Sequence, residues 1–118
     1  MIHQLYAAKL HSAVAIVLLL VFSFTASAEV DEMAAKKLAK SNNCFKCHAV
    51  DKEKDGPSYK KVAEKYRGKA EGEEKVIAQF TTGKMAKFPD GHEEEHRTIE
   101  SKDMGEIKNL ANWILSLQ

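Results

Sequence analysis

The sequence has little with which to hold a fold together covalently. It contains only two cysteines, Cys44 and Cys47, and a bridge between such close neighbours would not join distant parts of a chain. It shows no internal repeat, no low-complexity tract and no run with the alternation of a β-strand. These absences argue against a disulfide scaffold and a repeat protein, and they favour one small, mainly helical domain. A domain of this size often needs a metal or a cofactor to complete its core.

Acidic residues are absent from the first 28 positions, although 17 Asp and Glu follow them. In this opening segment Lys9 precedes 12 almost wholly apolar residues, 13–24, and Ala26-Ser27-Ala28 has the small-x-small pattern of a signal-peptidase site. The apolar run is too short to anchor the protein well in a membrane, since a spanning helix needs about 20 residues. The segment predicts a cleaved secretory signal over 1–28, a mature domain over 29–118 and a periplasmic location. An uncleaved N-terminal anchor is the alternative.

Neither sign of charge dominates the predicted mature chain, which has 17 basic and 17 acidic residues. This balance argues against a nucleic-acid partner, because nucleic-acid binders carry a strong basic excess. The charges are nevertheless segregated: residues 36–69 contain 11 basic and four acidic residues, whereas residues 71–108 contain 10 acidic and six basic. The segregation produces either a solvated surface of mixed charge without a further role or an electric dipole that orients a transient partner.

Apolar periodicity and end signals predict helices over 32–42, 59–66 and 71–82 and a last helix after Asp103. The first helix is expected to begin at Asp31 and to turn Met33, Ala34 and Leu38 inward. The last helix is the clearest, because Asp103 resembles the start of a capping box. Its apolar residues recur at helical spacing: Ile107, Leu110, Ala111, Ile114 and Leu117.

The central motif is Cys44-Phe45-Lys46-Cys47-His48, which matches the C-x-x-C-H sequence of c-type haem attachment. In such a motif two thiols add to the two vinyl groups of one haem, and the neighbouring imidazole binds the iron. A thioredoxin-like dithiol would require a βαβ context, and a zinc site would require further ligands at set spacing. The motif therefore predicts one covalently bound haem c per chain.

A second motif, His92-Glu93-Glu94-Glu95-His96, matches the H-E-x-x-H signature of zinc proteases. That chemistry requires a helix packed on a core, a third ligand and a substrate cleft. Here the run follows a Pro-Asp-Gly turn and has almost no apolar residue to bury. The sequence therefore argues against a zinc protease, and no enzymatic activity is expected.

Residues 32–118 resemble a small bacterial class I cytochrome c. The ordered features are an N-terminal helix, the C-x-x-C-H motif, Gly56-Pro57, two middle helices and a C-terminal helix with Leu110 and Trp113. The resemblance implies an all-α fold of four to five short helices around one haem, with the first and last helices crossing. It also implies that the Pro57 carbonyl accepts the ring N–H of His48. Five residues would pack at the crossing: Leu38, Ile107, Leu110, Trp113 and Ile114.

The sequence departs from this family at the distal iron ligand, which is usually a methionine followed by proline. No Met-Pro occurs; Met85 lies early and Met104 lies in the first turn of the last helix. When residues are counted back from Trp113 by the spacing of the resembled family, the position of the distal ligand falls near His96. His92 lies one helical turn earlier. We therefore expect His96 as the distal ligand, with His92, Met85 and Met104 as alternates and a lysine ranked last. The alternative for either histidine is a solvated side chain that binds no iron.

An iron with both axial positions filled leaves no site for a substrate, so the predicted function is one-electron transfer between transient redox partners by a monomer. Lysines around the haem motif provide a candidate docking face for an acidic partner, or only keep the protein soluble. Two other functions remain open: a gas-binding or sensing haem protein in which the sixth ligand is displaced, and a dedicated cytochrome subunit of a periplasmic dehydrogenase. The lysines are Lys36, Lys37, Lys40, Lys46, Lys52, Lys54, Lys60 and Lys61.

Overall fold

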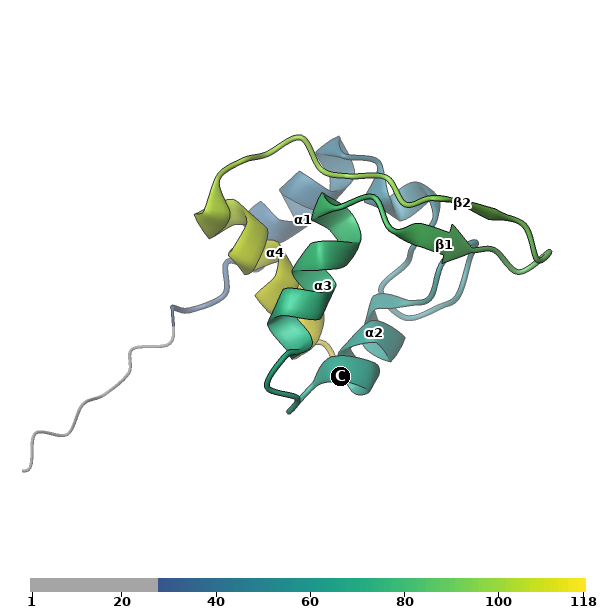
Figure 1. Ribbon diagram of the computed structural model, residues 1–118. Helices are drawn as coiled ribbons and strands as arrows, with labels where there is room; N and C mark the ends of the chain where they lie inside the picture. Colours follow the sequence, from purple (N-terminus) through teal and green to yellow (C-terminus); the bar gives the residue numbers. More distant parts are fainter. Residues whose placement is uncertain (1–27) are drawn as a thin grey trace, which may run out of the picture.

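Four α-helices and one short hairpin make up residues 28–118, the part of the chain that the computed structural model describes (Figure 1). The predicted signal, apart from Ala28, lies outside the described residues. The elements in chain order are α1 (Glu32–Ser41), the 3₁₀ turn η1 (Cys44–Lys46), α2 (Tyr59–Tyr66), α3 (Gly72–Thr81), β1 (Met85–Lys87), β2 (Glu93–Glu95) and α4 (Met104–Ser116).

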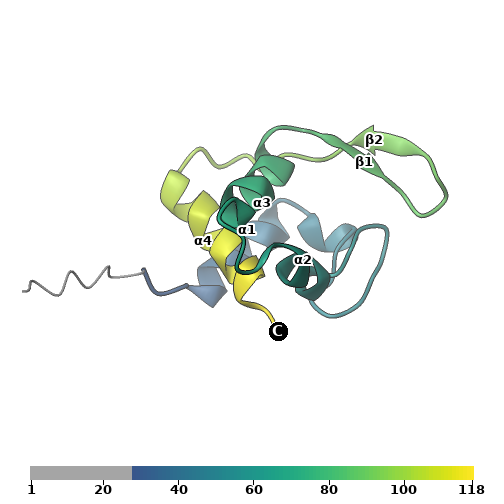
Figure 2. The ribbon, with the colours of Figure 1, turned by 60° about the horizontal axis from the view of Figure 1, so that its bottom comes forward.

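The first and last helices cross and form the centre of the core, as Figures 1 and 2 show. Asp31 begins α1 by accepting a hydrogen bond from the Ala34 N–H, and Asp103 begins α4 by accepting from the N–H groups of Gly105 and Glu106. The α4 residues expected at the crossing are buried, and Leu38 packs against them: Ile107, Leu110, Trp113 and Ile114. The predicted crossing is therefore confirmed.

The inward face of α1 was predicted correctly at Leu38, which packs against the core, but wrongly at Met33 and Ala34. Met33 is 81% exposed and Ala34 is exposed, whereas Ala35 and Ala39 are buried beneath α4. Alanines allow the two helix backbones to approach closely, and this packing requirement outweighs the larger apolar area of a methionine.

Helices α2 and α3 pack on α4 beside this crossing. Their bounds agree with the predicted ranges to within one residue at each end. Gly68 and Gly83 follow them with φ of +74° and +64°, values that glycine adopts without a Cβ clash. Asn43 has a φ of +58° in the turn after α1, which directs the chain into η1. Within residues 28–118, no helix has the length and apolar character needed to cross a bilayer.

The antiparallel hairpin formed by β1 and β2 was not predicted. Met85, Ala86 and Lys87 pair with Glu95, Glu94 and Glu93, respectively. The chain reverses in the Phe88–His92 turn, where Gly91 has a φ of +93°. Each strand has three residues, too few for alternating burial to mark them in the sequence. In Figure 1 the hairpin projects beyond the helices.

Candidate functional site

The 3₁₀ turn η1 brings the two cysteines close to each other. The Cys44 carbonyl accepts hydrogen bonds from the N–H groups of Cys47 and His48, at 3.2 and 3.0 Å. This tight turn places Cys44, Cys47 and His48 along the wall of one large cavity. Both cysteines are free and half-buried. Burial raises the pKa of the Cys44 thiol, so that in the unmodified chain the protonated form is favoured.

The His48 ring is held at one edge and is closely packed. Its Nδ1 lies 2.7 Å from the Pro57 carbonyl oxygen. Because a carbonyl has no proton to donate, Nδ1 carries the proton in this bond and Nε2 presents a lone pair. Burial lowers the pKa of His48, which favours this neutral form. This is the arrangement expected for a metal-ligating histidine.

His96 follows β2 and has a similar arrangement. Its Nδ1 lies 2.8 Å from the Arg97 carbonyl oxygen, so its Nε2 also presents a lone pair. Its backbone N–H donates to the Lys84 carbonyl, which closes the base of the hairpin, and the Ile99 N–H donates to the Phe80 carbonyl at the end of α3. Two backbone hydrogen bonds therefore fasten the segment that carries His96, one to Phe80 in α3 and one to Lys84 just before β1.

The rings of His48 and His96 lie in the wall of the same cavity, with centroids 6.0 Å apart and planes tilted by 45°. A ligating imidazole nitrogen lies about 2 Å from its metal ion, so two imidazoles on opposite sides of one ion have centroids on the order of 6 Å apart. The observed separation matches that spacing.

The cavity has a volume of about 1000 Å³, at the upper end of the roughly 300–1,000 Å³ range of small-molecule sites. Its apolar wall comes from α2, α3, α4 and β1, and the hairpin with its following segment closes the side of His96. Apolar and aromatic lining residues include Tyr59, Val62, Tyr66, Val76, Phe80, Phe88, Ile99, Leu110 and Ile114.

The other three candidate distal ligands are less well placed. His92 lies in the hairpin turn, where it stacks on Phe88 with centroids 4.3 Å apart and hydrogen-bonds to Asp90 and Glu94, and it does not line the cavity. Met104 is 55% exposed and does not line the cavity. Met85 lines the cavity but is 62% exposed.

The zinc-protease motif gains no support from the fold. His92 and His96 flank a β-strand instead of lying on one face of a helix. Among the described residues 28–118, no group of three or more His, Cys, Asp and Glu side chains is arranged to hold a metal ion.

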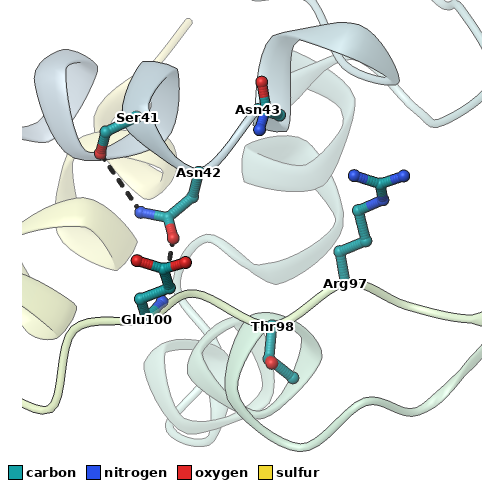
Figure 3. Close-up of a pocket in the computed structure, with 6 residues that line it drawn as sticks. All are labelled: Ser41, Asn42, Asn43, Arg97, Thr98 and Glu100. Atoms are coloured by element: carbon teal, nitrogen blue, oxygen red, sulfur yellow. Dashed lines mark hydrogen bonds between the residues drawn. The ribbon is translucent and has the colours of Figure 1, made fainter.

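A smaller polar hollow of about 330 Å³ adjoins the large cavity (Figure 3). Asn42 connects two residues that line this hollow, because its Oδ1 accepts a hydrogen bond from the Glu100 N–H at 2.9 Å. Asn42, Asn43, Arg97 and Thr98 line both spaces, so the hollow forms part of the mouth of the larger cavity. In Figure 3 the Arg97 guanidinium extends away from the Asn42–Glu100 bridge.

The eight lysines of the predicted docking face are not all free. Lys36 pairs with Glu32 at 2.5 Å, Lys61 pairs with Glu53 at 2.6 Å, and Lys54 donates to the Phe45 carbonyl at 2.7 Å. Of the eight, only Lys61 lines the cavity. Charged residues of both signs surround the cavity: Glu53, Asp55, Glu64, Glu94, Glu95, Lys61, Lys65, Lys87 and Arg97.

Two site features were missed by sequence reasoning. Tyr59 stacks on His48, with centroids 5.2 Å apart and an interplanar angle of 18°. A Cβ at Gly56 would lie 2.5 Å from Cε1 of His48, so only glycine fits beside the ring. The Gly-Pro pair could have signalled this close approach, whereas nothing local distinguishes Tyr59 from the other aromatic residues.

The residues present fit a covalently attached haem. Two thiols on one turn can form two thioethers, two imidazole rings lie 6.0 Å apart in the wall of one cavity, and that cavity accommodates a large flat group. Bound haem would also supply the apolar contacts that the small helical core lacks.

Comparison with known proteins agrees with this fit. The family model for cytochrome c matches residues 33–118. Class 1 cytochrome MtoD from Sideroxydans lithotrophicus ES-1 is 69% identical, with a TM-score of 0.73 over 75% of this chain and 98% of that chain. Cytochrome c552 of Nitrosomonas europaea is 30% identical, with a TM-score of 0.57 over 70% of this chain and 99% of that chain.

Among relatives known by sequence, cytochrome c-551 of Allochromatium vinosum is 34% identical over 80 residues, which are 68% of this chain and 82% of that protein. The similarity thus extends over nearly the whole domain that contains the cavity, the C-x-x-C-H turn and the crossing of α1 and α4. The chain belongs to the cytochrome c family, as a small class I cytochrome that carries one covalently attached c-type haem.

Proposed function

We propose that this cytochrome is a periplasmic one-electron carrier whose haem iron is ligated by His48 and His96. Haem-based electron transfer is the activity of the family; the ligand pair, the location and the manner of docking are the proposal. The observation that carries it is the pair of imidazoles 6.0 Å apart in the cavity wall, each with Nδ1 bound to a backbone carbonyl.

On the proximal side, Cys44 and Cys47 hold the haem through two thioethers and His48 binds the iron. Pro57 orients the His48 ring, because its carbonyl fixes which nitrogen carries the proton. Attachment at two thioethers and one nitrogen, all within five residues, keeps the haem in place through repeated oxidation and reduction.

On the distal side, His96 fills the sixth position. The Arg97 carbonyl fixes the tautomer of His96, and the backbone bonds at Lys84 and Phe80 hold the segment in place. Imidazole in place of a thioether should lower the reduction potential, since methionine–histidine ligation raises it. We therefore expect a low potential for this family.

The haem supplies the one-electron Fe(III)/Fe(II) couple. The protein binds the haem in an apolar cavity and fills both axial positions, which leaves no coordination site for a substrate. These features suit a carrier that exchanges one electron during brief docking with each partner.

The ligand assignment is tested by absorption and electron paramagnetic resonance spectra of the ferric protein. We expect a low-spin spectrum without the sulfur-to-iron charge-transfer band. His96→Ala should become high-spin or acquire a replacement ligand. His92→Ala is the matched control and should keep the wild-type spectrum, because His92 lies outside the cavity wall. A charge-transfer band in the wild type would instead assign a methionine, with Met85 and Met104 then replaced in turn.

Exposure of the ferrous protein to carbon monoxide separates this carrier from a gas-binding protein. A carrier with a firmly held His96 should keep its spectrum under carbon monoxide. Rapid formation of a carbon monoxide adduct by the wild type would favour ligand binding as the function.

The proposed periplasmic location depends on the signal over 1–28. Intact mass of the exported protein should equal residues 29–118 plus one haem that acid-acetone does not extract. A mass that includes residues 1–28 would contradict cleavage.

The eight lysines are proposed to dock an acidic partner. Electron transfer to hexacyanoferrate, an anionic probe, should slow as ionic strength rises, because salt screens attraction between exposed charges. Lys46→Glu should weaken this dependence, whereas Lys75→Glu on α3 is a control outside the lysine set. Equal effects of the two variants would mean that only net charge matters.

A further inference from the structure

Tyr59 packs against the ring of His48, although Tyr59 is not itself a candidate iron ligand. It is the first residue of α2 and is 5% exposed. Its ring is nearly parallel to the His48 imidazole, with an interplanar angle of 18° and centroids 5.2 Å apart. Tyr59 thus covers a face of the ring, whereas Pro57 binds its edge.

Gly56 restricts the same imidazole. A Cβ at this position would lie 2.5 Å from Cε1, 2.8 Å from Nδ1 and 3.0 Å from Nε2 of His48. The backbone of Gly56 therefore packs directly on the ring. With Nδ1 bonded to Pro57, the ring has little freedom to rotate while Tyr59 remains in place.

Tyr59 is itself firmly held. Its ring meets the rings of Trp113 and Phe45 edge to face, with centroid distances of 5.7 and 6.0 Å. Its backbone N–H donates to the Ala49 carbonyl at 2.9 Å. Because Trp113 in the last turn of α4 is 2% exposed and belongs to the core cluster, the stack on His48 is anchored in the core.

We propose that Tyr59 is a positioning residue, which fixes the rotation of the His48 imidazole about its bond to the iron. This inference rests on the proposed ligation by His48. The orientation of an axial imidazole sets the anisotropy of a low-spin ferric iron, and groups beside a ligand tune the metal that it binds. Tyr59 would thereby help to set the electronic properties of the haem without touching the iron.

The test compares Tyr59→Phe, Tyr59→Leu and Tyr59→Met in the haem-loaded protein. The readouts are the g-values of the ferric protein, the NMR shifts of the haem methyl groups and the reduction potential. Tyr59→Phe keeps the aromatic stack and should keep both the g-values and the pattern of methyl shifts. Tyr59→Leu removes the stack and should change both the g-values and the pattern of methyl shifts. Tyr59→Met also removes the stack, and its unbranched, flexible side chain adapts to an irregular gap, so it serves if the leucine variant does not fold.

Tyr66→Leu is the matched control, because Tyr66 lines the same cavity but does not stack on His48. Wild-type g-values in Tyr59→Leu or Tyr59→Met would overturn the proposal, and so would an equal change in Tyr66→Leu. A wild-type protein without a low-spin ferric signal would overturn the proposed ligation and this inference together, whereas a low-spin wild type with unresponsive Tyr59 variants overturns only the inference.

Discussion

Asn109 on α4 exchanges two hydrogen bonds with the backbone of Asp31, 78 positions earlier. Its Oδ1 accepts from the Asp31 N–H at 2.9 Å, and its Nδ2 donates to the Asp31 carbonyl at 2.8 Å. Asp31 is also the residue that caps α1. One side chain thus joins the beginning of the first helix to the middle of the last helix.

Replacing Asn109 should loosen the crossing of α1 and α4. We expect Asn109→Ala to lower the free energy of unfolding by about 1–3 kcal/mol, because each hydrogen bond contributes roughly 0.5–1.5 kcal/mol net. Guanidinium titration of the ferric protein, followed by far-ultraviolet circular dichroism, measures this loss. Asn112→Ala, on the same helix, removes no side-chain hydrogen bond of the described residues and should cost less. Equal losses for the two variants would show that the two hydrogen bonds to Asp31 make no net contribution to the free energy of unfolding.

Adding a methyl group at Gly56 should displace the His48 ring. The new Cβ would lie 2.5 Å from Cε1, so Gly56→Ala should cost about 1–3 kcal/mol and reduce the low-spin fraction of the ferric protein. Gly68→Ala separates this contact from general backbone strain, because Gly68 has a φ of +74° but open space around it. That variant should lose some stability while its absorption spectrum stays unchanged. A normal spectrum in Gly56→Ala would mean that the ring has room to move.

The fold should depend on attachment of the haem. Cys44→Ala/Cys47→Ala leaves a cavity of about 1000 Å³ in a domain with few other core contacts, so we expect a largely disordered or degraded chain. Helical circular dichroism and resistance to proteolysis measure the effect. Cys47→Ala alone retains one thioether and should remain folded. Native helicity in the monomeric double variant would contradict this expectation.

Protonation of His92 should stabilise the hairpin. The hydrogen bond to Glu94, followed by that to Asp90, raises the pKa of His92 above its ordinary value of 6.5. The contribution to stability is therefore complete below pH 6.5 and is lost as the pH rises through the folded-state pKa. NMR titration of the diamagnetic ferrous protein should show this raised pKa, and Glu94→Gln should lower it. Glu93 makes no side-chain hydrogen bond or ion pair with His92, so Glu93→Gln should leave the pKa of His92 unchanged.

The sequence predicts the parts of this fold that depend on local chemistry. Asp31, Asp103 and the glycines after α2 and α3 mark helix ends because their side chains or dihedral angles act within one turn of the chain. The C-x-x-C-H motif predicts the haem for the same reason, since all of its atoms act within five residues.

What the sequence did not predict depends on contacts between distant segments. The inward face of α1 is set by how closely α4 approaches, so Ala35 is buried and Met33 is not. The hairpin forms because its base is fastened at Lys84 and its following segment at Phe80, both through backbone groups with no residue signature. The stack of Tyr59 on His48 joins α2 to a loop and becomes visible only when both are in place. His96 remains a prediction that its position in the cavity wall supports.

Both imidazoles of the proposed ligand pair are tied to backbone carbonyls, of Pro57 and Arg97, and neither is tied to a carboxylate. A peptide carbonyl neither gains nor loses a proton anywhere in the range in which cells live. Neither of these hydrogen bonds is therefore lost through titration of its acceptor. In the proposed ligand pair, reduction of the iron would therefore require no proton exchange with the acceptors of these two hydrogen bonds.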